Sequence, residues 1–227
     1  MYSRAILSAC VTALLSVHTA AVDTTRDPAL DASLNTATTQ LDRLALLPND
    51  SQWTFDFTEQ ASYTFAPGSV VNANAATFPA AVDNGLTLAM INLGPCSMLP
   101  PHFHPRATNY VVAFAGNTTT YMIAENGAPL ITETLTPGQM TIFPRASLHA
   151  MQNTDCENNA QLVSALSSTD SGTHNVVNGL FSLPSNIVAA AFGNPIDGVK
   201  VDAGAIPAVG TGSIVGDEEC RKRCGLI

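Results

Sequence analysis

HFHPRATNY, residues 102–110, and FPRASLH, residues 143–149, are the two segments from which this chain can first be interpreted. The chain has 5 histidines, and three of them, His102, His104 and His149, lie in these segments. Side chains alternate faces along a strand, so His102 and His104 present their imidazoles to the same side. His149 adds a third nitrogen if another strand brings it across. Neutral imidazole binds transition metals well, so the pattern predicts a metal site; the competing interpretation is a group of hydrogen-bonded polar residues.

Short apolar runs separated by turn residues surround the two segments. Asn126-Gly127 is a strong hairpin signal, and Pro137-Gly138 marks another turn. Many short strands at such spacing indicate a β-sandwich or β-barrel, and without an internal repeat they indicate a single one. The expected strands are 53–57, 69–72, 87–93, 109–114, 118–124, 130–135, 140–143, 149–152 and 161–166.

Helical patterns flank the strand-rich region. A helix is expected from Asp27 to Leu47, where an acidic N-cap and a proline precede leucines at helical spacing. Further helices are expected at Pro184–Phe192 and Asp217–Arg223, with a loose tail over Val199–Ile214. The predicted organisation is an N-terminal helical segment at 22–50, a β-domain at 51–168 and C-terminal helices with a tail at 169–227.

The first residues, 1–21, resemble a secretory signal peptide. Arg4 precedes a largely apolar run at 5–17, which is too short to span a bilayer, and small residues follow before Val22. We therefore expect a secreted, extracellular protein without a membrane anchor. Asn49 and Asn117 each begin an N-x-S/T sequon, which predicts a glycoprotein with both sites at the surface.

The charge balance excludes several classes of partner. The chain has 18 acidic and 9 basic residues, a formal net charge of −9 at pH 7. A protein of this charge is repelled by nucleic acids and by anionic membrane surfaces, so neither is expected as a partner.

Four cysteines remain once the signal segment is removed. An even number in an oxidising compartment predicts two disulfides, and three pairings are possible. The preferred pairing is Cys96–Cys156, across the flanks of the histidine segments, with Cys220–Cys224 closing a tight C-terminal loop.

The two segments together resemble the two motifs of the cupins. Residues 102–109 are similar to the first motif as germins and the fungal and slime-mould spherulin-like proteins have it, close to H-x-H-P-R-A-T-E. Residues 137–139, 143–145 and 149–153 are similar to the second motif, and residues 219–226 resemble the C-terminal tail of the fungal group. The resemblance implies an all-β fold, a single cupin jelly-roll β-barrel with N-terminal and C-terminal helices.

The resemblance also implies a metal site. The family's three histidine ligands fall on His102, His104 and His149, whereas its fourth ligand, a glutamate, is replaced by Asn109. The expected cofactor is one divalent transition-metal ion. Germins are similar proteins that bind manganese, but a neutral amide in place of a carboxylate shifts the preference of the site toward copper, zinc or nickel. Asn109 either ligates weakly through its carbonyl oxygen or turns away and leaves a position open.

Two functions are compatible with this ligand set. The favoured expectation is a non-enzymatic metal-binding, storage or stress protein. The alternative is a metal-dependent oxidoreductase, similar to oxalate oxidase or superoxide dismutase, acting on a small anionic substrate. Arg106 either steers such a substrate inward or pairs with a surface acid, and His174 is assigned no role. The N-terminal helix suggests a homo-oligomer.

Overall fold

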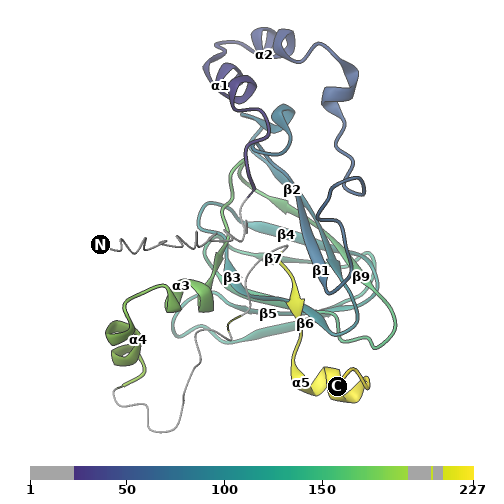
Figure 1. Cartoon of the computed structure of the whole chain (residues 1–227), viewed down its shortest axis with the longest axis vertical. Coiled ribbons are helices and arrows are strands. Elements are labelled where there is room, and N and C mark those ends of the chain that lie inside the picture. Colours follow the sequence, from purple (N-terminus) through teal and green to yellow (C-terminus); the bar gives the residue numbers. More distant parts are fainter. Residues whose placement is uncertain (1–22, 194–205, 207–211) are drawn as a thin grey trace, which may run out of the picture.

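A computed structural model describes residues 23–193, 206 and 212–227 of the chain (Figure 1). The predicted signal segment at 1–21 and most of the tail predicted at Val199–Ile214 lie outside the described residues. Among the described residues, no helix has the length and the apolar character needed to cross a membrane.

Two antiparallel sheets form the body of the described chain. One has five strands in the order β1-β2-β9-β4-β7, and the other has the order β10-β3-β8-β5-β6 with β11 also paired to β3. This all-β jelly-roll architecture confirms the expected fold class. The strands are β1 (Gly68–Ala73), β2 (Thr87–Leu93), β3 (Ser97–Phe103), β4 (Asn109–Ala115), β5 (Thr118–Ile123), β6 (Ile131–Leu135), β7 (Met140–Phe143), β8 (Leu148–Gln152), β9 (Ala160–Leu166), β10 (His174–Asn175) and β11 (Ile214–Val215).

The main apolar core lies between the inner faces of the two sheets. Alternate residues of β4 and β9 point inward, as a strand with one solvated face requires. The largest enclosed side chains of this core are Phe143, Leu93, Met151 and Leu162, each exposed by 1% or less. The segment 143–149 contributes directly to this core, because its first residue is Phe143.

The predicted helix at Asp27–Leu47 is two helices, α1 (Pro28–Thr36) and α2 (Gln40–Leu46). Thr39 interrupts it because this residue caps α2, in a capping box with Asp42. The two helices pack on the loop that holds η2 (Pro79–Ala81), through a small second core that includes Leu34 and Leu47. They project away from the sheets at the top of Figure 1.

The prediction of a strand at 53–57 is wrong. Trp53 ends a short 3-10 helix, η1 (Asp50–Trp53), and its indole Nε1 donates to the carbonyl of Leu47 at 3.1 Å. The alternating aromatic residues that suggested a strand instead pack on one another, since the rings of Phe55 and Phe57 lie 4.9 Å apart. No strand of the described chain pairs with this segment, so the alternating residues do not form part of a sheet.

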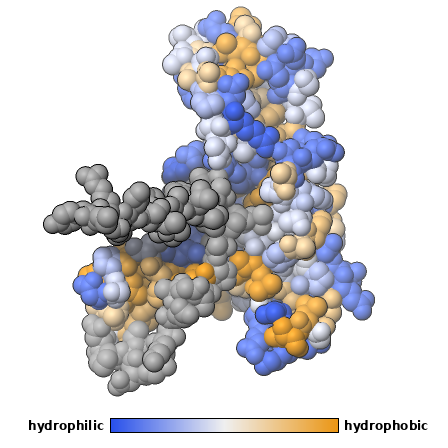
Figure 2. Space-filling model, in the orientation of Figure 1, coloured by the Kyte–Doolittle hydropathy of each residue, from blue (hydrophilic) through white to orange (hydrophobic). Residues whose placement is uncertain are grey.

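The C-terminal helices are α3 (Val176–Phe181), α4 (Ser185–Ala191) and α5 (Glu218–Arg223), and the last two lie where they were predicted. Figure 2 shows apolar surface over the N-terminal helices and over α3 and α4, where Leu41 and Ile187 are exposed by 76% and 52%.

The preferred disulfide pairing is wrong. The bonds are Cys96–Cys220 and Cys156–Cys224, which span 124 and 68 residues of sequence. The reason is that α5 returns to the barrel instead of closing on itself: β11 pairs with β3, and the Arg223 guanidinium donates to the carbonyl of Thr154 at 2.6 Å. Two cysteines four residues apart share one face of a helix, so each meets a different cysteine of the barrel.

Candidate metal centre

Two neighbouring strands bring His102 and His149 together. His102 lies on β3 and His149 on β8, and the antiparallel register places them directly opposite each other. Their ring centroids are 4.2 Å apart. Residues directly opposite each other on two antiparallel strands have their side chains on the same face. The register of β3 on β8 therefore brings the two histidines together, and the sequence alone does not specify that register.

His104 follows the end of β3 and joins the pair from the loop. Its ring centroid lies 5.2 Å from that of His102 and 5.4 Å from that of His149. The second segment supports this loop, because the amide of Ala146 donates to the carbonyl of His104 at 3.1 Å. One nitrogen from each of the three rings lies within 4.8 Å of the other two. The sequence prediction that these three imidazoles meet is therefore confirmed.

A backbone carbonyl fixes the orientation of each ring. The Nδ1 atoms of His102, His104 and His149 lie 2.8, 2.7 and 2.9 Å from the carbonyl oxygens of Pro100, Gly172 and Ser147. A carbonyl oxygen only accepts, so each Nδ1 carries the proton and donates it. Each Nε2 therefore keeps its lone pair, which is the form that a metal ion requires.

Burial keeps the three rings neutral. The side chains of His102, His104 and His149 are exposed by 5%, 8% and 2%. Burial, with a smaller repulsion from His104, lowers the pKa of His102 to about 4. Burial also lowers the pKa of His104. Burial, followed by repulsion from His102, lowers the pKa of His149 to about 2. At neutral pH the cluster therefore offers uncharged nitrogen donors.

One atom of the cluster directly supports metal binding. Nε2 of His149 is buried and has no hydrogen-bond partner in the described chain. Leaving a buried acceptor unsatisfied costs about 1–3 kcal/mol, and a coordinated cation removes that cost. The ring of Phe143 stacks on His149 at 4.2 Å and an angle of 10°, so this imidazole has little freedom to turn toward another partner. The residues present therefore fit a metal ion.

Asn109, the residue at the family's glutamate position, is also enclosed. It lies on β4, opposite Phe143 of β7 and Leu166 of β9, and its side chain is exposed by 2%. Its Oδ1 accepts a short hydrogen bond from the hydroxyl of Ser164 on β9. This contact engages the oxygen that would have to bind the ion. Ligation by Asn109 therefore stays a prediction.

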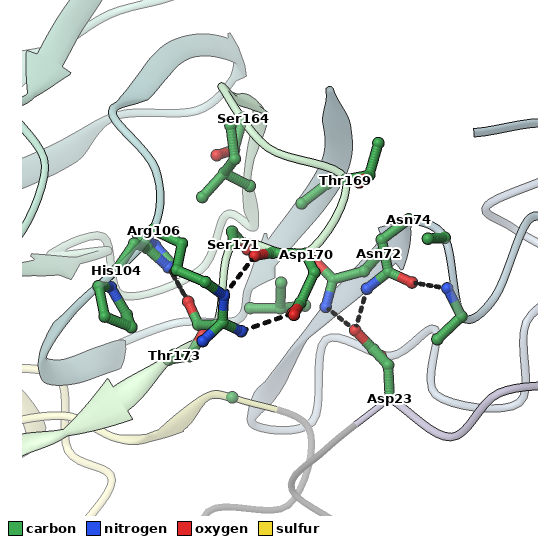
Figure 3. Close-up of a pocket in the computed structure, with 18 of the residues that line it drawn as sticks. Asp23, Asn72, Asn74, His104, Arg106, Ser164, Thr169, Asp170, Ser171 and Thr173 are labelled. Carbon is green, nitrogen blue, oxygen red and sulfur yellow. Dashed lines mark hydrogen bonds and ion pairs between the residues drawn. The ribbon is translucent and has the colours of Figure 1, made fainter. Parts of the chain in front are cut away.

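A cavity of about 1100 Å³ leads to the histidines, and His102, His104 and Ser164 are among its lining residues. Figure 3 shows its polar wall, in which Asp23 accepts from the amides of Asn72 and Asn74 at 2.9 and 2.6 Å.

Arg106, also on this wall, is paired with a surface acid. Its guanidinium contacts the Asp170 carboxylate at 2.6 Å and also donates to the Asp170 carbonyl at 2.7 Å (Figure 3). The structure thus favours the second of the two roles considered for this arginine.

His174 lies close to the cluster without belonging to it. It pairs with Phe103 in the short strand β10, and the two rings stack at 4.9 Å. Its side chain is exposed, whereas the three clustered histidines are buried. The exposed ring makes His174 a matched control for any experiment on the cluster.

Comparison with known proteins places this arrangement in a family. Residues 57–196 match the sequence pattern of the cupin family. The chain belongs to the cupin family. Within the family it is germin- and spherulin-like: this cupin is 30% identical to Spherulin-1A of Physarum polycephalum over 201 residues, covering 88% of the chain and 80% of the relative.

Two further comparisons agree with this assignment. Germin-like protein 3-1 of Oryza sativa subsp. japonica is 31% identical to this cupin over 170 residues, covering 73% of the chain and 69% of the relative. A solved structure of recombinant oxalate oxidase in complex with glycolate superposes with a TM-score of 0.58 at 22% identity, over 63% of this cupin and 75% of that chain. At that identity the likeness concerns the fold.

Sequence reasoning found the three ligand candidates of this cupin but missed the residues that orient them. The carbonyls of Pro100, Ser147 and Gly172 carry no side-chain signal, because any residue has a carbonyl. Ser164 was also missed, since a single serine in a strand is unremarkable until the register places it beside Asn109.

Proposed function

We propose that this cupin is a secreted protein that binds one divalent transition-metal ion through Nε2 of His102, His104 and His149. We further propose that it serves as a metal-binding, storage or stress protein and not as an enzyme. The proposal rests on one observation above all: three buried imidazoles donate through Nδ1 to carbonyls, so their three Nε2 lone pairs are left for a shared partner.

The chemistry of the donors supports a preference among metals. Three neutral imidazoles, without the carboxylate that germins have, favour copper, zinc or nickel over the manganese that the family resemblance implies. When bound, such an ion would supply a positive charge able to polarise a further ligand. The histidines would hold it in a fixed geometry, because each ring is anchored by a carbonyl and His149 is also stacked on Phe143.

The proposal is tested by measuring metal stoichiometry and affinity. Purified protein is stripped with a chelator, titrated with Mn²⁺, Cu²⁺, Zn²⁺ and Ni²⁺, and followed by calorimetry and elemental analysis. We expect one equivalent per chain, and a loss of affinity of at least a hundredfold in His102→Ala and His149→Ala. His174→Gln is the control and should bind as tightly as the wild type. Binding that survives both alanine substitutions would refute the site.

The alternative function is a metal-dependent oxidoreductase acting on a small anion such as oxalate or superoxide. Among the charged residues lining the cavity in the described chain, Asp23, Asp31 and Asp170 outnumber Arg106. Arg106 is already paired with Asp170, so the side chains of the cavity wall add little attraction for an incoming anion beyond that of the metal ion itself. The discriminating assay measures superoxide dismutation and oxalate turnover with Mn²⁺ and with Cu²⁺ loaded. Turnover well above that of His149→Ala would replace the storage proposal with the enzymatic one.

We also propose that the protein self-associates. Supporting observations are apolar side chains on the outer face of the β4–β7 pair, where Tyr110 lies opposite Ile142 and the two are exposed by 47% and 41%. Phe114, at the end of β4, is exposed by 68%. Sedimentation velocity should give a mass of at least two chains for the wild type, and a lower mass for Tyr110→Ser with Phe114→Ser. A wild type that stays monomeric at about 50 μM would refute self-association.

A further inference from the structure

The contact between Asn109 and Ser164 joins two buried polar side chains on the inner face of the sheet that faces the histidines. Asn109 is exposed by 2% and Ser164 by 1%, and the Ser164 hydroxyl donates to Oδ1 of Asn109. Ser164 lines the same cavity as His102 and His104. Asn109 lies opposite Phe143, whose ring stacks on His149. Asn109 therefore lies next to the residue that packs on His149, it contacts a residue that lines the cavity, and one end of its amide is already engaged.

The engaged end is the one that a metal ion would need. An asparagine ligates through its carbonyl oxygen, whereas its nitrogen only donates. Oδ1 and Nδ2 diverge from the same carbon, so an amide whose oxygen is turned to Ser164 directs its nitrogen away from that serine. In the described part of the chain the hydrogen bond between Asn109 and Ser164 uses Oδ1, and Nδ2 donates to no other residue.

We propose that Asn109 is not a metal ligand but a hydrogen-bond donor to an anion bound beside the ion, with Ser164 as the residue that positions its amide. This inference rests on the proposed metal site and adds a role for the position at which the family has a glutamate. The positive end of an N–H dipole facing a cation is repulsive unless an anion lies between them. Loss of the carboxylate therefore converts this position from a charge that stabilises the ion into a donor that stabilises an anion.

The inference predicts coupling between the two ligands. An anion that bridges the ion and Nδ2 is bound more tightly when both are present, and by linkage it raises the affinity for the metal by the same factor. A hydrogen bond to a charged group contributes enough for about a tenfold to hundredfold change in anion affinity. Metal affinity without the anion should change little when Asn109 is replaced, because Asn109 donates no electron pair to the ion.

Azide is a suitable probe, because its binding to Cu²⁺ gives a visible charge-transfer band that needs no turnover. Copper affinity is measured by competition with a chelator, and azide affinity by optical titration of the copper-loaded protein. The main variant is Asn109→Leu with Ser164→Ala, which removes the amide and leaves no orphaned hydroxyl. Asn109→Ser is a second, smaller change that keeps a partner for Ser164. Ser164→Ala alone releases the amide from its anchor.

The expected result is a copper affinity within about threefold of wild type and an azide affinity lowered about tenfold or more in both Asn109 variants, with a smaller loss in Ser164→Ala. A tenfold loss of copper affinity with unchanged azide affinity would overturn the inference, since Asn109 would then ligate with its amide turned the other way. Unchanged affinity for both ligands would overturn it as well. Failure of the wild type to bind copper would instead refute the proposed function, and this inference with it.

Discussion

Acidification of the metal-free protein should destabilise it steeply, because the three clustered histidines are buried in neutral form. In the unfolded chain these histidines take up protons near pH 6.5, whereas in the folded chain the pKa of His102 is lowered to about 4 and that of His149 to about 2. Between these values the unfolded state binds more protons than the folded state, so stability falls as the pH falls. Above pH 6.5 the two states bind equally and this contribution is flat.

The size of the effect follows from the shifts. One pKa unit corresponds to about 1.4 kcal/mol. Acidification from pH 6.5 to pH 4 therefore costs about 3 kcal/mol through His102 alone, whose pKa is lowered from 6.5 to about 4. His149 adds about the same amount over this window, because its pKa lies lower still. A loss of about 6 kcal/mol is comparable to the whole stability of a typical domain, so the metal-free protein should unfold between about pH 4 and pH 5.

The assay is urea unfolding followed by circular dichroism at pH 7.5, 6.5, 5.5 and 4.5, with chelator and with saturating Zn²⁺. Bound metal stabilises the folded state by mass action, so the loaded protein should keep its stability to a lower pH than the stripped one. In His149→Leu the stripped protein should lose about 1.4 kcal/mol less per pH unit below pH 6.5, because one titrating group is gone. His174→Gln should behave as the wild type. Equal pH slopes in wild type and His149→Leu would refute the reasoning.

Two further predictions concern the supports of the site. Removing the bond Cys156–Cys224 by a double serine substitution should lower the free energy of unfolding by up to about 4 kcal/mol, because the bond closes a span of 68 residues; non-reducing peptide mapping that found another pairing would contradict the structure. Gly172→Ala should lower the free energy of unfolding by about 1–2 kcal/mol and weaken metal binding, since φ is +65° and an added Cβ would lie 2.8 Å from Arg106 Nη2. Gly138→Ala is the control: its φ is +88° and the space around it is open, so metal affinity should be unchanged.

Many strands and turns of this protein can be predicted from its sequence, because the local chemistry of neighbouring residues specifies them. Turn residues such as Asn126-Gly127 separate the strands, and β2 and β7 lie at their predicted bounds. The alternation of side chains along a strand predicts that His102 and His104 share a face, and the two-motif resemblance predicts that His149 joins them. The failures are also physical: the aromatic residues at 53–57 alternate like a strand, but no neighbouring strand is there to pair with them.

Other features depend on contacts between residues far apart in the chain, and these only the tertiary structure could decide. The return of α5 to the barrel determines which cysteines meet, and nothing in their spacing records that return. The carbonyl of Gly172 anchors His104 across 68 residues, and Ser164 holds the amide of Asn109 across 55. The sequence by itself determined which side chains are able to bind a metal, because that is a property of each residue type. The folded chain decided which atoms of those side chains are free to do so, because hydrogen bonds to distant backbone and side-chain groups fix their orientation.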